Sequence, residues 1–160
     1  MRAITFEPIG VIRSPFVQQA GTPIQPAFAR DTRGSLELDP RYADALKDLE
    51  GFERIWAIYH LDRVGPYQPV VVPFLDDVPH GLFATRSPCR PNPIGISVLR
   101  LISVVGSRVE VEGVDMLDGT PLLDIKPYIP EFDAVSPSRA GWFDRSKTRR
   151  STADARFGTP

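Results

Sequence analysis

The sequence predicts an all-β protein: a small β-barrel with one short helix and an irregular C-terminal tail. Short apolar or alternating runs recur along the chain, and only one stretch shows helical spacing. The 17 prolines lie mostly between these runs, as is typical of the loops of a β protein. Because closure is the general way to hide strand edges, many short strands with a single helix favour a barrel.

The predicted strands begin near the N-terminus and follow one another at short intervals. They cover residues 6–14, 35–39, 55–61, 70–72, 81–85, 95–105, 108–114 and 122–128. The run at 55–61 is apolar on both faces, so we expect it in the interior of the sheet. Gly106-Ser107 between two β-rich runs predicts a hairpin turn.

One helix is predicted after the strand at 35–39. Asp39 is a favourable N-cap residue, and Pro40 suits the first helical position. Apolar side chains then recur at helical spacing as far as Leu49. Gly51 stands where a C-terminal glycine is expected, so the helix should end there.

Length and charge predict one domain with a basic extension. A chain of 160 residues suits a single domain, and 42% hydrophobic residues can form a core. Residues 134–160 carry six basic and two acidic side chains, which leaves −5 on residues 1–133 because the whole chain carries −1. We therefore expect a domain over 1–133 and an extension over 134–160. The basic residues of the extension are Arg139, Arg145, Lys147, Arg149, Arg150 and Arg156.

The sequence favours a cytoplasmic protein that binds no metal. Cys89 is the single cysteine, which excludes an intrachain disulfide and favours a reducing compartment. The first residues lack the apolar run of a signal peptide, and the apolar runs elsewhere are too short to span a membrane. The two histidines and the cysteine show no metal-ligand spacing.

The densest group of polar candidates lies in the loop at residues 83–95. Arg86, Arg90 and Asn92 are interleaved there with three prolines, which stiffen the backbone and fix the direction of its polar groups. Arginines in such a loop commonly bind carboxylates or phosphates. A purely structural loop, with arginines paired to acidic neighbours, is an equally good interpretation of these residues alone.

Two further candidates have ordinary structural explanations. Asp115 and Asp118 could bind a cation or ribose hydroxyls, although Asp118-Gly119 is also a common turn signal. His60 ends an apolar strand, where a histidine is more often a core residue than a catalyst. The glycine-rich nucleotide-binding patterns are absent from the sequence. The residues alone therefore predict a small β protein with a rigid arginine-bearing loop.

Four sequence motifs resemble the TrmO family. They are GVIRSPF at 10–16, LEGF at 49–52, the block at 81–95, and the block at 115–128 that ends DIKPY. Members of this family are tRNA methyltransferases that methylate N6 of threonylcarbamoyladenosine beside the anticodon. The resemblance covers about residues 4–133. It implies a β-barrel methyltransferase domain, S-adenosylmethionine as cofactor, tRNA as partner and a homodimer.

The resemblance also implies which residues form the site. Those expected to bind the cofactor are Pro23, Ile24, Gln25, His60, Leu61, Arg86, Asp115, Met116, Leu117 and Asp118. Those expected to take part in catalysis are Arg86, Arg90 and Asn92. The sequence departs from the family at Ile24, where arginine is frequent, and in length, because the bacterial members with the tRNA activity continue into a further C-terminal domain.

The chemistry of the expected ligands agrees with these residue types. Asp115 or Asp118 can oppose the sulfonium cation of the cofactor or bind its ribose. Arg86 or Arg90 suits the threonyl carboxylate of the substrate. The carbamoylated N6 is a poor nucleophile and needs a base or a hydrogen-bond acceptor beside it.

Two other functions compete with methyl transfer. One is a cysteine-dependent enzyme, in which Arg90 would favour the thiolate of Cys89. The other is a regulatory protein that binds S-adenosylmethionine without transferring its methyl group.

The extension has its own competing interpretations. Its basic residues could contact phosphates of the anticodon stem, and its aromatic residues could dock on a partner subunit or stack on bases. These aromatic residues are Trp142, Phe143 and Phe157. A disordered end is equally compatible with the sequence.

Overall fold

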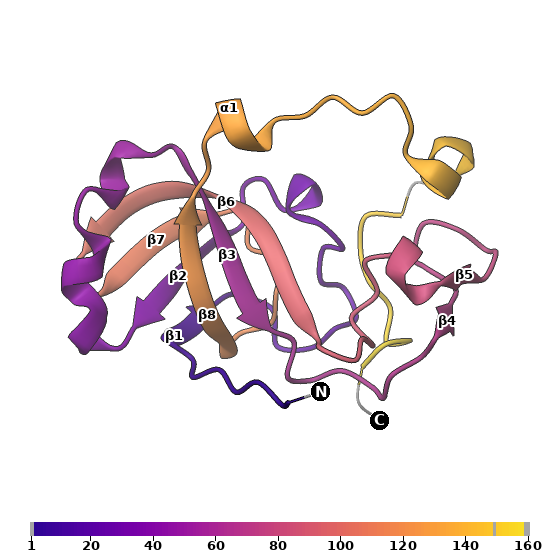
Figure 1. Ribbon diagram of the computed structural model, residues 1–160, viewed down its shortest axis with the longest axis horizontal. Coiled ribbons are helices and arrows are strands. Elements are labelled where there is room, and N and C mark those ends of the chain that lie inside the picture. Colours follow the sequence, from indigo (N-terminus) through magenta and orange to yellow (C-terminus); the bar gives the residue numbers. More distant parts are fainter. Residues whose placement is uncertain (1, 149, 159–160) are drawn as a thin grey trace.

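Six antiparallel strands close into a barrel in the order β1-β2-β7-β6-β3-β8 (Figure 1). The computed structural model describes residues 2–148 and 150–158. The barrel strands are β1 (Gly10–Arg13), β2 (Arg33–Leu38), β3 (Arg54–His60), β6 (Ile94–Val105), β7 (Arg108–Glu112) and β8 (Thr120–Pro127). The predicted barrel is therefore confirmed, with β1 and β8 shorter or shifted relative to the predicted runs.

Strand β3 occupies the interior position that its apolar sequence predicts. It pairs with β6 on one side, from Arg54↔Arg100 to His60↔Ile94, and with β8 on the other. The hairpin between β6 and β7 is also confirmed, since Val105 pairs with Arg108 and Gly106 has a φ of 59°. A left-handed backbone of this kind favours glycine.

The main core fills the barrel. Inward side chains alternate along the strands, with the outward ones more exposed. Gly95 is needed because a Cβ there would overlap the ring of Tyr59 on the neighbouring strand. The fully buried residues of this core include Ile12, Leu36, Ile55, Ala57, Leu99, Val109, Val114 and Leu122.

The prediction of a continuous helix up to residue 51 is wrong. Asp39 does cap the first turn, because its side chain accepts a hydrogen bond from Arg41 N at 3.0 Å, and Pro40 is the first helical residue. The segment forms two 3-10 helices, η2 (Pro40–Leu46) and η3 (Leu49–Gly51). Lys47 leaves the helical conformation with a ψ of 134°, and Asp48 is left-handed with a φ of 66°, so the helix is interrupted between Leu46 and Leu49.

The strand predicted at 81–85 is also wrong. Only β5 (His80–Gly81) is extended there, and it pairs with β4 (Val70–Val71) in a separate two-stranded sheet. The chain then turns into the 3-10 helix η4 (Leu82–Ala84), which ends where Thr85 N donates to Leu82 O at 2.9 Å. This turn makes residues 85–93 a loop rather than the end of a strand.

The structure also has three short helices that the sequence did not predict. They are η1 (Pro26–Phe28), α1 (Pro130–Asp133) and η5 (Gly141–Arg145).

A second apolar cluster lies outside the barrel. It combines Val71, Leu82 and Cys89 with Phe157 from the C-terminal segment, and Phe74 packs against it. We call residues 64–90 the side lobe. Figure 1 shows the chain arching from α1 over to this lobe, where the C-terminal segment then runs. Across residues 2–148 and 150–158 there is no helix with the length and apolar character needed to cross a membrane.

Candidate functional site

A chain of hydrogen bonds connects the barrel interior to the turn that follows β7. The Tyr59 hydroxyl and Ser97 Oγ lie 2.9 Å apart, and Ser97 Oγ donates to Asp115 Oδ1 at 2.8 Å. Tyr59 and Ser97 are buried, whereas Asp115 is half-buried. The network therefore places one carboxylate at the boundary between the core and the surface.

This environment makes Asp115 unusually easy to protonate. Burial raises the pKa of its carboxyl from 3.8 to about 7, against the opposing effects of the Ser97 hydrogen bond and the Arg86 charge. Burial and the Asp115 charge also raise the pKa of Tyr59, so its hydroxyl stays protonated. A nearby cation therefore stabilises the ionised form of this carboxylate strongly, because burial otherwise disfavours that form.

Arg86 and Gln25 supply the second part of the site. The Arg86 guanidinium donates to Gln25 Oε1, which joins the arginine loop to the segment before η1. Arg86 itself is exposed, and its charge acts on both Asp115 and Tyr59. Three residues expected at the site are therefore close together, although they come from parts of the chain far apart in sequence.

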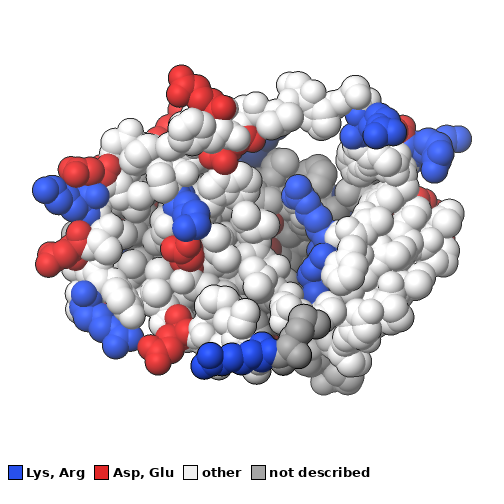
Figure 2. All heavy atoms as spheres, viewed as in Figure 1, with Lys and Arg blue, Asp and Glu red and all other residues white. Residues whose placement is uncertain are grey.

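The remaining expected positions are held nearby by backbone contacts. Leu61 N donates to Pro93 O at 2.7 Å, which fixes the end of β3 against the arginine loop. Pro23 and Ile24 precede Gln25, and Ile24 N donates to Ser151 O at 3.0 Å. Figure 2 shows a hollow between the barrel and the side lobe, with Lys or Arg side chains on its wall.

The turn at 115–118 has mixed roles. Met116 is 3% exposed and belongs to the barrel core, so its side chain does not face the hollow. Asp118 Oδ1 accepts from Ser14 N at 3.2 Å, and its other oxygen lies 3.7 Å from Arg13 Nη1. Leu117 O accepts from Thr120 Oγ1 at 2.7 Å. Asp115 is thus the carboxylate of this turn that faces the Arg86 charge, while Asp118 attaches the turn to the end of β1.

Arg90 and Asn92 lie differently from Arg86. Arg90 is half-buried and donates to Thr85 O at 3.0 Å, with its guanidinium 5.4 Å from the centre of the Phe83 ring. Arg90 therefore stabilises its own loop. Asn92 is exposed, and its backbone carbonyl accepts from Ile94 N at 2.8 Å. The structural interpretation of the loop thus fits Arg90, and the ligand-binding interpretation fits Arg86.

Cys89 lies in the wrong surroundings for a nucleophile. It is fully buried in the second cluster, 3.7 Å from Phe157 O, and burial raises the pKa of its thiol. The neighbouring Arg90 guanidinium is directed to Thr85 O instead. These contacts oppose the cysteine-dependent enzyme as an interpretation.

We expect Cys89→Ala to retain nearly the full activity of the parent protein in the methyl transfer that the family resemblance implies. The loss of a buried sulfur should instead lower the free energy of unfolding by about 1 kcal/mol. Initial rates and urea unfolding of the same preparation measure both effects. A variant that folds normally but has no activity would favour the cysteine-dependent enzyme as the interpretation.

Ser97 and Tyr59 were not predicted as site residues. A signal was present in the sequence: Ser97 is the polar residue between Gly95 and Leu99 at inward positions of β6. A polar side chain at an inward position needs a hydrogen-bond partner, and here the partners are Tyr59 and Asp115. The sequence alone does not bring the three together.

Other parts of the described chain offer weaker candidates for a ligand-binding or metal-binding site. A surface hollow between η2, η3 and the far end of β6 is lined by Leu46, Lys47, Glu50 and Val104, none of which was expected to bind a ligand. Within residues 2–148 and 150–158, no three His, Cys, Asp or Glu side chains lie together in a way that could hold a metal ion.

Known proteins resemble this chain over most of its length. The chain is 46% identical over 156 residues to a probable S-adenosyl-L-methionine-binding protein of Pyrococcus abyssi, covering 96% of this chain and 85% of the relative. It is 38% identical over 152 residues to the tRNA (adenine(37)-N6)-methyltransferase of Escherichia coli, covering 89% of this chain and 65% of that protein.

The fold agrees with these relatives. The crystal structure of TrmO from Pseudomonas aeruginosa superimposes with a TM-score of 0.74 at 39% identity, covering 88% of this chain and 62% of the other. The chain therefore spans less than two thirds of the Escherichia and Pseudomonas proteins. Residues 11–134 match the family described as the tRNA-methyltransferase O N-terminal domain, and this chain belongs to that family.

Proposed function

We propose that this protein transfers a methyl group from S-adenosylmethionine to N6 of threonylcarbamoyladenosine, 3′ of the anticodon in tRNA. The observation that carries the proposal is the half-buried Asp115 carboxylate facing the charge of Arg86 in a member of this family. When bound, the cofactor supplies an electrophilic methyl group on a sulfonium cation. Relatives from Escherichia coli, mouse and human are named as tRNA (adenine(37)-N6)-methyltransferases.

The residues present fit this cofactor. Asp115 offers a carboxylate whose ionised form gains from a neighbouring positive charge. Gln25 and Arg86 offer an amide and a guanidinium, which suit the polar ends of an amino-acid head or a nucleoside. Ile24 and Leu61 are half-buried apolar side chains of the same region. The other proposed cofactor positions are neighbours of these residues in the chain: Pro23 precedes Ile24, His60 precedes Leu61, and Met116, Leu117 and Asp118 follow Asp115.

We assign substrate binding to Arg86, and positioning of its loop to Arg90 and Asn92. Arg86 is exposed and one of its guanidinium nitrogens donates to Gln25, so its remaining N–H groups can bind a carboxylate or a phosphate. Arg90 and Asn92 stabilise the loop through Thr85 O and Ile94 N. Because methyl transfer is an in-line displacement, alignment of the two ligands accounts for much of the rate.

We further propose a homodimer in the cytoplasm, with residues 1–133 as the methyltransferase domain and 134–160 as an extension. Ile94 and Ile96 point outward from β6 beside the arginine loop and are 44% and 54% exposed. A second copy is the partner we assign to this apolar strip. A reducing compartment suits the free thiol of Cys89.

A regulatory protein that binds S-adenosylmethionine is the second candidate. The relatives named as S-adenosyl-L-methionine-binding proteins favour it, including one from Archaeoglobus fulgidus of which the alignment covers 93%. Both candidates require the same cofactor site. They differ in whether a methyl group reaches tRNA.

The deciding experiment uses tritiated S-adenosylmethionine and tRNA from cells that lack this methylation. We expect label in the anticodon-loop nucleoside and, in calorimetry, micromolar cofactor affinity with no heat from ATP. Cofactor binding without label transfer to modified tRNA would favour the regulatory protein. No cofactor binding would exclude both candidates.

A further inference from the structure

The C-terminal segment forms a strand-like contact with the segment that leads to the proposed cofactor site. Pro23 and Thr152 form an isolated antiparallel bridge. Three backbone hydrogen bonds flank it: Gly21 N to Ala153 O at 2.9 Å, Ala153 N to Thr22 O at 2.7 Å, and Ile24 N to Ser151 O at 3.0 Å. The backbone immediately before Gln25 is therefore held by the end of the chain.

Phe157 attaches the same segment to the side lobe. It is 4% exposed, and its ring lies 5.1 Å from that of Phe74 in an edge-to-face arrangement. Its carbonyl accepts from Gly65 N at 3.0 Å and lies 3.7 Å from Cys89 Sγ. Phe157 thus touches both the arginine loop, through Cys89, and the chain shortly after Leu61.

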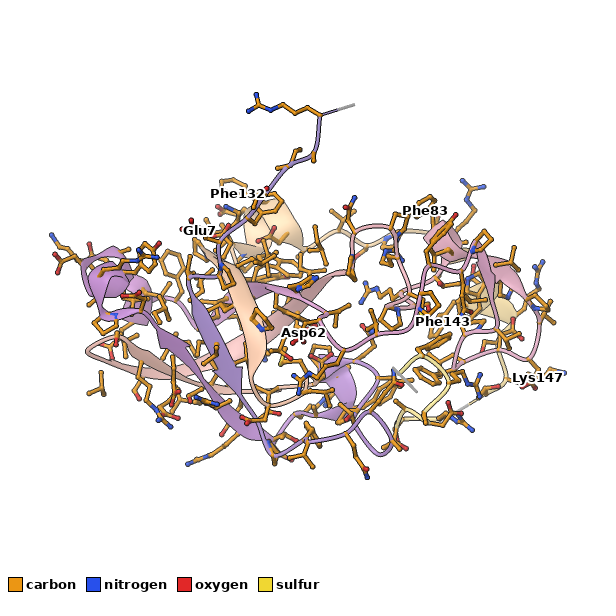
Figure 3. The ribbon with its side chains drawn as sticks, turned by 90° about the horizontal axis from the view of Figure 1, so that it is seen from below. Glu7, Asp62, Phe83, Phe132, Phe143 and Lys147 are labelled. Carbon is orange, nitrogen blue, oxygen red and sulfur yellow. The ribbon has the colours of Figure 1, made fainter. Side chains whose placement is uncertain are left out.

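Trp142 makes a third attachment. Its indole nitrogen donates to Ala84 O at 2.7 Å, two residues before Arg86. Its ring stacks on His80 with the centroids 4.8 Å apart, and His80 bonds to Asp76 at 2.9 Å. Figure 3 shows Phe143, the residue after Trp142, at the side lobe rather than at the barrel.

Two basic residues of this segment stabilise its contact with the side lobe. Arg150 and Arg156 both pair with Asp154, at 2.5 and 2.7 Å. Arg156 donates further to Val72 O at 3.3 Å, and its guanidinium lies 5.1 Å from the centre of the Phe74 ring. These two arginines are thus less available to bind tRNA phosphates than the sequence suggested. Arg149 lies outside the described residues.

We propose that residues 141–148 and 150–158 are a clamp that positions three segments beside the cofactor site. The clamp contacts the segment at 21–24, which carries Pro23 and Ile24, the arginine loop, which carries Arg86, and Gly65, which follows Leu61 closely in the chain. Barrel pairing joins the end of β3 to the start of β6, but the second cluster is separate from the barrel core, so the segment at 21–24 and the side lobe depend on other contacts for their placement. Loops that are ordered before binding lose less entropy when a ligand binds, which raises affinity. This inference rests on the proposed cofactor.

The test variant is Phe157→Ala, with Phe157→Leu as the conservative rescue and Phe132→Ala as the matched control. Phe132 lies on α1 and is 75% exposed, so its removal leaves the clamp intact (Figure 3). We expect the dissociation constant for S-adenosylmethionine to rise at least about tenfold in Phe157→Ala, to recover largely in Phe157→Leu, and to stay unchanged in Phe132→Ala.

Hydrogen exchange separates positioning from simple support of the fold. If clamp and cofactor are coupled, the cofactor must stabilise the docked clamp by the same factor by which docking raises its affinity. Saturating S-adenosylmethionine should therefore slow exchange of the amides of Ile24, Gly65 and Ala153 in the parent protein. These amides donate to Ser151 O, Phe157 O and Thr22 O.

Two outcomes would overturn the clamp. Exchange at these amides could be unaffected by saturating cofactor, or Phe157→Ala could bind it with the affinity of the parent. If Phe157→Ala does not fold, Ala153→Pro is used, because it removes the hydrogen bond to Thr22 O and leaves the Phe157 cluster in place. A parent protein that fails to bind the cofactor would instead refute the proposed function and leave clamp docking measurable by exchange.

Discussion

The Asp115→Asn variant is expected to unfold at higher urea concentration than the parent protein at pH 8, yet to bind S-adenosylmethionine at least about tenfold more weakly. An asparagine at this position can still accept the Ser97 hydrogen bond, so the contact at 2.8 Å survives. It carries no charge, so the cost of burying the carboxylate is removed. The favourable interaction with a cationic cofactor is removed with it.

The sign of the pH dependence follows from the raised pKa. The carboxyl of Asp115 has a pKa of about 7 when folded, against 3.8 as the ordinary value. Between about pH 4 and 7 the folded protein holds a proton that the unfolded chain has lost, so stability falls as pH rises. The decrease in the free energy of unfolding is complete above about pH 7. It amounts to a few kcal/mol, since one pKa unit corresponds to about 1.4 kcal/mol.

Urea unfolding at pH 5 and pH 8 measures this slope. The parent protein should lose stability over the interval, and Asp115→Asn should lose much less. Asp118→Asn is the matched control for stability, because Asp118 belongs to the same turn and its bond from Ser14 N can also be kept by an amide. A parent protein with equal stability at the two pH values would contradict the assignment of a buried charge to Asp115.

Arg86→Ala should lower kcat/KM for tRNA methylation at least about 100-fold, which corresponds to about 2.7 kcal/mol of transition-state stabilisation. Arg86 is exposed, so stability should change little. The variant removes the guanidinium that bonds Gln25 and acts on Asp115. Arg86→Lys should recover only part of the rate, because an ammonium cannot replace a planar two-pronged donor.

Arg33→Ala provides the control for the loss of an exposed arginine. Its side chain is 80% exposed on β2, in a surface ion pair with Glu112. Such pairs contribute about 0–1 kcal/mol, so rate and stability should both stay near the parent values. Single-turnover rates with saturating cofactor and limiting tRNA make the comparison. Equal losses of methylation rate in Arg86→Ala and Arg33→Ala would show that the effect comes from the loss of any positive charge and not from a specific site at Arg86.

The sequence by itself determined the barrel strands, because inward and outward positions alternate and β3 is apolar on both faces. It also determined the start of η2, since Asp39 and Pro40 act through bonds within their own turn. The resemblance to the family implied Gln25, Arg86 and Asp115 as site residues, and the structure brings these three close together.

The tertiary structure decided everything that depends on partners distant in sequence. The reversal at Asp48 replaced one helix by two, and the pairing of β5 with β4 replaced the strand predicted at 81–85. The raised pKa of Asp115 is caused by burial at the edge of the barrel, which the tertiary packing decides and which the Ser97 hydrogen bond only partly offsets. The course of the C-terminal segment was decided in the same way. A short polar run has no periodicity to reveal its fold, and Phe157 is buried against apolar surface that Val71, Leu82 and Cys89 provide from elsewhere in the chain.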